Sequence, residues 1–432
     1  MAAQTADALP RRRIFVAASL ALFTAGLSFS LRAAAIAGIE AQILRFLDPL
    51  HSGERAGALL GIASLGFAAT LALATLALGR IGMGRALALA GALFSLGTAV
   101  AIAAPALANG EGVHQGLRLG FLLCGLGWGF MEASINPLTA TIYPEDTTAR
   151  LNLLHAWWPA GIIVGGLVGI AGGALQLPWQ AQLAATLAPA LATIALCRGV
   201  AFPRTARAAA GVAWGEMFRE LSRRPSYFVW LACMFLTAAS ELAPGQWIDL
   251  TLSRTVGMRG IWLLVYVSGM MFVLRHFAGP IAHRLSNLGM LWGSVTLATA
   301  GLFLLARADS PLSALASASV WGLGVCFLWP TMLANVAERF PRGGELAIGG
   351  LAVAGALAIE LVLPRLGAIF DRERLALAGG PDALAALADA QRLAIERSAA
   401  QTSFETLALL PAALILVFGA IWAWERRGAR PA

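Results

Sequence analysis

The stretch GLGWGFMEASINPLTATIYP (residues 125–144) recurs in weakened form as GLGVCFLWPTMLANVAERFP (322–341), 197 residues later. The matched positions are Gly125, Gly127, Phe130 and Pro144 in the first copy and Gly322, Gly324, Phe327 and Pro341 in the second. A looser correspondence links GRIG (79–82) with HRLS (283–286) at a similar shift. Such a repeat predicts a chain built from two similar halves in parallel orientation.

The composition indicates a membrane protein. Of the 432 residues, 59% are hydrophobic and 12% are charged, whereas soluble domains carry about 25% charged residues. Apolar runs near 20 residues recur along the chain, and each is long enough to cross a hydrocarbon core of about 30 Å as a helix. Because backbone groups in lipid must bond internally, these long runs predict helices rather than the short alternating strands of a barrel.

The expected fold class is an all-α polytopic membrane protein with about twelve transmembrane helices in two pseudo-symmetric halves of six. The expected spans are 14–38, 56–78, 84–107, 116–141, 153–175, 179–200, 227–249, 259–280, 287–306, 311–338, 346–368 and 404–424. The predicted domains are an N-terminal half (1–200), a cytoplasmic linker with an amphipathic helix (201–226) and a C-terminal half (227–432). Within the C-terminal half, residues 369–403 are predicted to form an extracytoplasmic loop with a second amphipathic helix.

The arginines predict the orientation. All 31 basic residues are arginine, and the net charge is +8. They gather at both ends of the chain and in loops on one side, which the positive-inside rule places in the cytoplasm. The apolar run 14–31 is longer than the roughly 7–15 residues of a signal-peptide core, which predicts an uncleaved first span. We therefore expect a protein of the bacterial cytoplasmic membrane with both termini cytoplasmic.

Other classes of function lack their sequence signatures. The arginines are scattered in short loops, so we expect no nucleic-acid partner. The cysteines form no CxxC, and no GxSxG, HExxH or Walker motif occurs. The sequence thus predicts no enzyme, no metal and no cofactor.

Twelve spans, a 6+6 repeat and a basic central loop together resemble the major facilitator superfamily. That superfamily carries a loop signature after span 2 with an acid, a basic residue, a glycine and further basic residues. The corresponding loop here is LGRIGMGRAL (78–87), in which Arg80, Gly82 and Arg85 fit and Gly79 stands at the position of the acid. The resemblance implies alternating access around a site near the midplane between the halves.

A second resemblance is more specific and covers about 30 residues. The segment MEASINPLTATIYPEDTTARLNLLHAWWPAG (131–161) is similar to the fucose–proton symporter-like branch. The positions that match the branch in order are Glu132, Asn136, Pro137, Pro144, Glu145, Arg150, Leu151, Asn152, Leu153 and Gly161. The resemblance implies that Glu132 carries the coupling proton. That branch also has an acid in span 1, where this chain offers Arg32.

Ionisable side chains inside an apolar span are candidates for function because they are costly there. In span 4 the spacing of Glu132, Asn136, Thr139 and Tyr143 places them on one helical face, which predicts either a polar cavity wall or helix–helix hydrogen bonding. If spans 1 and 4 both border the cavity, as the resemblance implies, Arg32 in span 1 could pair with Glu132 as a lock or substrate clamp, or as a structural salt bridge. His155 could take part in proton coupling or be a structural group.

Spans 7, 8 and 10 contribute further candidates. Span 7 contains Glu241, Gln246 and Trp247 around a predicted break at Pro244–Gly245, a set that suits a polyhydroxylated ligand or, alternatively, an outer hinge. Span 10 contributes Trp329 and Asn335, with Thr331 on the same face. Arg275 in span 8 is expected to extend to the membrane interface. The other ionisable residues in the spans are His276, which follows Arg275, and Glu360 in span 11.

Transport fits these features best. We predict a secondary active transporter of a small polar solute, a sugar or a sugar-like compound, with a proton as co-substrate and the lipid bilayer as its environment, acting as a monomer. The predicted substrate-binding residues are Arg32, Asn136, Glu241, Gln246, Trp247, Trp329 and Asn335, and the predicted proton-coupling residues are Glu132 and His155. The alternatives are an exporter of amphipathic compounds and a receptor or scaffold that transports nothing.

Overall fold

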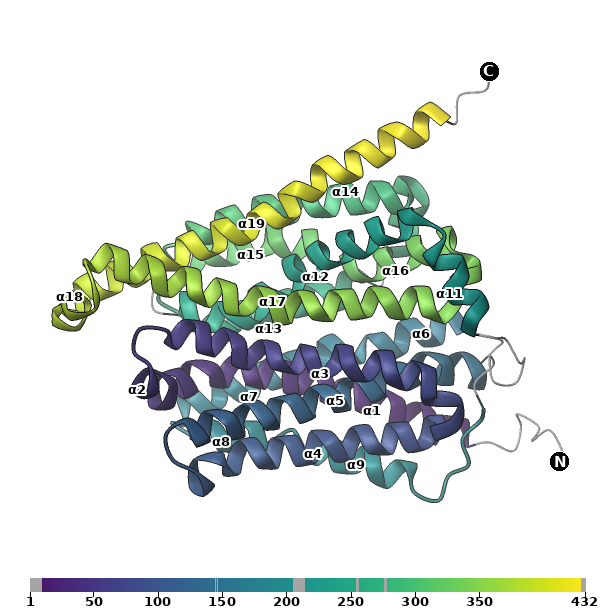
Figure 1. Cartoon of the computed structure of the whole chain (residues 1–432), viewed down its shortest axis with the longest axis horizontal. Coiled ribbons are helices and arrows are strands. Elements are labelled where there is room, and N and C mark those ends of the chain that lie inside the picture. The colour runs from purple at the N-terminus through teal and green to yellow at the C-terminus, as the bar shows by residue number, and fades with distance from the viewer. Residues whose placement is uncertain are drawn as a thin grey trace. The chain divides into compact units, whose positions relative to one another are not determined.

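The structure is a computed structural model, and it describes residues 10–143, 145, 147–204, 214–253, 256–275 and 278–428. Pro144 and His276 lie outside the described residues, as does the side chain of Asn152. All regular elements of the described residues are helices, which Figure 1 shows as coiled ribbons along the chain. The predicted all-α fold is confirmed.

Contacts divide the chain into two compact units. Unit 1 comprises Met1–Arg32 and Ile62–Arg219, and unit 2 comprises Ala33–Gly61 and Glu220–Ala432. The predicted boundaries of the two halves stay a prediction. The division into units rests on contacts between residues, and these depend on the conformation of the protein as well as on the repeat.

Unit 1 is built from eight elements that supply the first six predicted spans. They are α1 (Arg11–Ile39), α3 (Ser52–Ile81), α4 (Met83–Leu107), α5 (Glu111–Ile142), α6 (Thr147–His155), α7 (Trp157–Ala174), α8 (Trp179–Ala184) and α9 (Leu187–Cys197). The last residues of α1 and the first turns of α3 belong to unit 2.

Unit 2 contains the remaining elements, apart from the residues up to Arg219 of a short helix in the predicted linker, which belong to unit 1. At the end of α1 follow the π-helical turn η2 (Glu40–Leu44) and α2 (Arg45–Leu47). The C-terminal elements are α12 (Pro225–Leu252), α13 (Ile261–Arg275), α14 (Ala278–Ala306), α15 (Pro311–Val325), α16 (Leu328–Arg339), η4 (Pro341–Gly343), α17 (Gly344–Ala378), α18 (Pro381–Ala386) and α19 (Asp389–Gly428). The short α11 (Trp214–Ser222) forms within the predicted linker, as an amphipathic helix with Met217 and Leu221 buried.

The predicted spans correspond to helices of sufficient length. Ten segments among the described residues are long and apolar enough to cross a membrane. The other two predicted spans are α13, which is shorter, and α5, which carries Glu132 and Asn136. The protein is therefore an integral membrane protein with about twelve spans.

Glycines position α5 at the centre of unit 1. A Cβ at Gly125 would collide with the backbone of Ala63 on α3, and a Cβ at Gly127 would lie 2.8 Å from the carbonyl oxygen of Ala90 on α4. Small residues let helix backbones approach closely in membranes, where packing replaces the hydrophobic effect. The GLGWG motif thus fixes the helix that carries the candidate site.

The same glycine pattern recurs in unit 2. Gly324, the counterpart of Gly127, approaches the backbone of Ala298 on α14, the helix that precedes it. In both units the second glycine of the repeat therefore meets the preceding helix, α4 in one case and α14 in the other. This contact gives the sequence repeat a shared packing role.

The structure corrects the predicted helix break. Span 7 was expected to be interrupted at Pro244–Gly245, but α12 continues through both residues to Leu252. A proline leaves the carbonyl four residues earlier without its helical donor, and here the indole Nε1 of Trp321 donates to that carbonyl, of Ser240, at 3.1 Å. The interruption lies instead in span 10, where α15 ends at Val325 and α16 begins at Leu328.

The start of α3 packs against α17 within unit 2. Gly57 lies against the backbone of Leu363, and Gly367 against the backbone of Gly53. The carboxylate of Asp371 accepts a hydrogen bond from the backbone N–H of Glu54 at 2.9 Å. Residues 33–61 therefore group with unit 2 through backbone-to-backbone contact.

The predicted loop 369–403 is largely helical. Its first residues continue α17 to Ala378, and residues from Asp389 onward begin α19. Between them Gly379 ends α17 with φ +82°, a left-handed conformation that glycine adopts without strain. The placement of this segment outside the membrane stays a prediction.

We expect Gly125→Ala to lower stability by about 1–3 kcal/mol, because the added methyl group must displace the backbone of Ala63. Gly269→Ala on α13 is the matched control, since a Cβ there meets no atom within 4 Å. Thermal unfolding of both purified variants in detergent measures the difference. Equal unfolding temperatures for the two variants would show that close packing at Gly125 is unimportant.

Candidate functional site

Three predicted site residues form one hydrogen-bonded chain in unit 1. Glu132 and Asn136 lie one turn apart on α5, and the Asn136 amide Nδ2 donates to the Glu132 carboxylate Oε1 at 3.2 Å. The Asn136 Oδ1 lies 2.8 Å from Nε2 of His155, the last residue of α6. The two predicted proton-coupling residues are thus joined through a predicted substrate-binding residue.

The geometry fixes the proton on His155. An amide oxygen can only accept a hydrogen bond, so Nε2 of His155 must be the donor when Nδ2 of Asn136 faces Glu132. Glu132 has no basic side chain within ion-pair distance among the described residues. The hydrogen-bond partner of this acid is therefore a neutral amide.

The polar face predicted on α5 ends near Asn136. Thr139 is fully buried, and its hydroxyl has no hydrogen-bond partner among the described residues. Tyr143 packs edge-on against Phe15 at 5.6 Å between ring centroids, and the guanidinium of Arg150 lies 4.5 Å from the Tyr143 ring centre. Thr139 therefore belongs to the protein interior, and the half-buried Tyr143 contacts Phe15 and Arg150.

Four aromatic rings form a ladder through unit 1. Trp128 on α5 stacks on Phe67 at 4.4 Å and on Trp158 at 4.9 Å, and Trp158 lies 5.6 Å from Phe29 on α1. The ladder therefore connects α3, α5, α7 and α1, and these include the helix of Glu132 and the helix of Arg32.

Arg32 is buried in unit 1 and does not pair with Glu132. Its Nε donates to the carbonyl of Ser28 at 3.2 Å, and its guanidinium carbon lies 5.6 Å from the ring centre of Phe121. Phe121 and Glu132 are eleven residues apart on α5, which corresponds to about 16 Å along the helix axis. The ion pair considered from the sequence is therefore not formed in this structure.

In unit 2 an ion pair bridges the interruption of span 10. The Arg275 guanidinium donates to the Glu241 carboxylate at 3.3 Å and to the carbonyl of Cys326 at 3.1 Å. The other carboxylate oxygen of Glu241 accepts the backbone N–H of Trp329 at 3.1 Å. Arg275 thus faces the end of α15 and Glu241 the start of α16, the charges that the two helix dipoles favour. The extension of Arg275 to the interface stays a prediction, and the structure shows its guanidinium bound to Glu241 and Cys326.

Of the remaining candidates of unit 2, Trp247, Asn335 and Gln246 are buried, and Trp329 is half-buried. The Trp247 indole is fully enclosed, and its N–H has no partner among the described residues. The Asn335 carbonyl accepts from Arg339 Nε at 3.0 Å, while its Nδ2 has no partner there. Gln246 is 1% exposed, and the Trp329 ring lies against Gly355.

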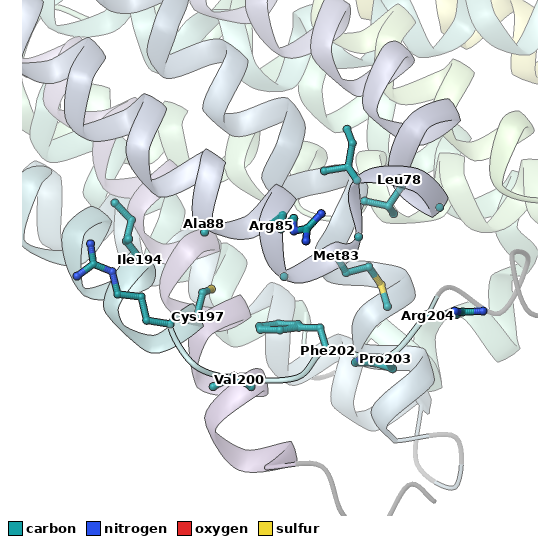
Figure 2. Close-up of a pocket in the computed structure, with 15 residues that line it drawn as sticks. Leu78, Met83, Arg85, Ala88, Ile194, Cys197, Val200, Phe202, Pro203 and Arg204 are labelled. Carbon is teal, nitrogen blue, oxygen red and sulfur yellow. The ribbon is translucent and has the colours of Figure 1, made fainter. Parts of the chain in front are cut away.

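A cavity of about 570 Å³ lies in unit 1 beside the loop LGRIGMGRAL. Exposed arginines line it, Arg85 and Arg204 among them, and Figure 2 shows both together with Met83 and Phe202. The Phe202 ring packs on Gly84, which has no side chain to exclude it. Gly79 supplies no carboxylate, and α4 begins without an acid in its first turn. This cavity contains none of the predicted site residues.

Comparisons with known proteins agree with the fold. The sequence model of the Major Facilitator Superfamily matches residues 14–363. A search of curated proteins found no match. Each of three solved structures is similar to this chain, although the sequence identity is low.

The xylose transporter XylE from E. coli in its inward open conformation has a TM-score of 0.71 and 14% identity, covering 95% of this chain and 96% of that one. A POT family transporter in complex with a thioalcohol conjugated peptide has a TM-score of 0.74 and 10% identity, covering 99% and 100%. A point mutant of the nucleoside transporter NupG has a TM-score of 0.68 and 12% identity, covering 94% and 99%. At these identities the likeness concerns the fold alone.

We expect Arg275→Gln to destabilise the protein by about 3–5 kcal/mol, because it leaves the buried carboxylate of Glu241 without its partner. Glu241→Gln should cost less, because the Arg275 side chain that it leaves is 24% exposed. The double variant should lose less than the two single losses together. The exposed pair Arg307–Glu405 is the control, and Arg307→Gln should cost about 0–1 kcal/mol. Thermal unfolding in detergent tests this, and strictly additive losses would contradict the pairing.

Proposed function

This chain belongs to the Major Facilitator Superfamily, and we propose that it is a proton-coupled secondary transporter of a sugar or sugar-like solute. Membership in the superfamily makes it a membrane transporter of a small solute. The solute class, the proton and the roles of individual residues are the proposed part. Alternating access of a midplane site supplies the mechanism, and a proton gradient drives it.

The proposal rests on the hydrogen bonds that connect Glu132, Asn136 and His155. While Glu132 is ionised, it accepts from the Asn136 amide, and the amide oxygen accepts from His155. When Glu132 gains a proton, its hydroxyl becomes a donor. The amide of Asn136 can then reverse, accept from Glu132 and donate to His155 in its other tautomer. Protonation of Glu132 would thereby change the hydrogen bond between Asn136 on α5 and His155 at the end of α6.

Buried donors without partners support the solute class. Among the predicted substrate-binding residues, the donors of this kind in the described part of the chain are Arg32 Nη1, Trp247 Nε1 and Asn335 Nδ2. Buried polar groups are rarely left unpaired in native proteins. The hydroxyl oxygens of a sugar could accept hydrogen bonds from such groups, in line with the similar fold of the solved xylose transporter.

The finer assignments belong to the same proposal. Residues 131–161 support a place near the fucose–proton symporter-like branch, because its motif falls on the segment that carries Glu132 and His155. The arginine distribution supports a bacterial cytoplasmic membrane protein with both termini inside. We propose that the monomer is the transporting unit.

We expect external acid to stimulate uptake into proteoliposomes by the wild-type protein, and Glu132→Gln to abolish that stimulation while exchange of solute without a gradient persists. A glutamine can hydrogen-bond with Asn136 but cannot carry the coupling proton. Glu111→Gln, at an exposed acid in the first turn of the same helix, is the control and should retain the acid response. Radiolabelled uptake of sugars and polyols with and without a pH gradient measures both properties.

An unchanged acid response in Glu132→Gln would remove Glu132 as the coupling site. His155→Gln tests the relay separately: the variant should retain exchange and weaken the acid response.

A further inference from the structure

Arg32 is a buried cation whose charge is unbalanced. The residue is 4% exposed, and it lies on α1 inside unit 1. Its polar contact is to a neutral group, the carbonyl of Ser28, and the Phe121 ring lies beneath the guanidinium. Among the described residues no carboxylate pairs with it, and its Nη1 has no hydrogen-bond partner.

The other buried charges of the described chain are treated differently. Each of the pairs lies within 3.3 Å, namely Glu40–Arg45, Glu241–Arg275, Asp249–Arg259 and Asp371–Arg374. Glu396 lines the same small cavity as Arg45 and Arg374. The arginines of these pairs therefore have a carboxylate partner, which Arg32 lacks, while the acid Glu132 has a neutral amide as its partner.

The surroundings of Arg32 leave a defined binding geometry. The cation–π contact with the Phe121 ring, whose centre lies 5.6 Å from the guanidinium carbon, occupies none of the hydrogen-bond donors of Arg32. Nε is engaged by Ser28, so the open donor is on the Nη side. A carboxylate binds the edge of a guanidinium through two parallel hydrogen bonds and also neutralises its charge, whereas a hydroxyl supplies hydrogen bonds alone.

We infer that the transported solute carries a carboxylate, which Arg32 binds, so that the substrate is a sugar acid or a related hydroxylated acid rather than a neutral sugar. The inference rests on the proposed transport function and names its substrate class.

The separation of Arg32 from Glu132 gives the two residues separate tasks. Because about three helical turns lie between the level of Arg32 and Glu132 on α5, the proton does not compete with the substrate for one charge. One monoanion and one proton carry no net charge together. Uptake should therefore depend on the pH gradient and not on the membrane potential, unlike the symport of a neutral sugar with a proton.

The test compares hexuronates and aldonates with neutral hexoses in proteoliposomes. The wild-type protein should take up an acid, galacturonate or gluconate, at least about tenfold better than galactose or glucose. Arg32→Gln should lower the affinity for the acid roughly 30-fold or more, since one partner of a buried charge pair is lost. Arg32→Lys should restore part of it. Arg118→Gln, which removes a positive charge one turn before Phe121 on α5, is the control and should bind as the wild type.

Thermal unfolding separates binding from a structural role. Arg32→Gln should be at least as stable as the wild type without solute and should lose the stabilisation by galacturonate. Destabilisation without solute would mark Arg32 as structural and overturn the inference. Equal uptake of neutral hexoses by wild type and Arg32→Gln, with no preference for acids, would overturn it while the proposed function stands. No uptake and no thermal shift with either class would overturn both.

Discussion

In unit 2, buried carboxylates accept hydrogen bonds from backbone N–H groups at the starts of other helices, and these bonds connect its elements. The carboxylate of Asp371 accepts from the first turn of α3, that of Glu241 from the start of α16, and that of Asp249 from the N–H of Ile261 at the start of α13. Each of these acids also pairs with an arginine. A carboxylate at a helix N-terminus satisfies donors that the helix cannot and interacts favourably with its dipole. The paired arginine then offsets the remaining charge in a medium where unbalanced charge is costly.

Close glycine contacts make this arrangement possible. Between α3 and α17 the backbones meet at Gly57 and Gly367, and this brings Asp371 within reach of the first turn of α3. In unit 1 the glycines of α5 serve helix packing instead. The helices that pack against α5 therefore determine the position of its polar side chains. Ion pairs connect elements in unit 2, whereas neutral hydrogen bonds and stacked rings connect them around Glu132.

The sequence predicted what depends on local pattern. The length of apolar runs located the spans, and helical spacing placed Glu132 and Asn136 on one face, where the structure joins them. That His155 also contacts Asn136 was not predicted. The sequence could not predict at which positions along neighbouring helices two side chains lie opposite each other. Arg32 and Glu132 were considered as partners because the family resemblance implies that spans 1 and 4 both border the cavity, but Arg32 reaches α5 at Phe121, about three turns away. Nor could it predict that Trp321, 77 residues after Pro244, would replace the donor that the proline removes.

Corresponding positions of the two repeat copies both lie beside a carboxylate, but the two carboxylates have different partners. Trp329 occupies the position that corresponds to Glu132, and its backbone N–H is bound by the carboxylate of Glu241 from another helix. Both copies of the repeat therefore have a carboxylate near the same position. In unit 2 the acid pairs with Arg275 across a helix interruption, while in unit 1 the acid meets a neutral amide on an unbroken helix. A paired charge suits a structural joint, and an acid beside a reversible amide suits a group that must gain and lose a proton. The difference between the two partners, arginine in one unit and asparagine in the other, is therefore what favours Glu132 over Glu241 for the proposed coupling step.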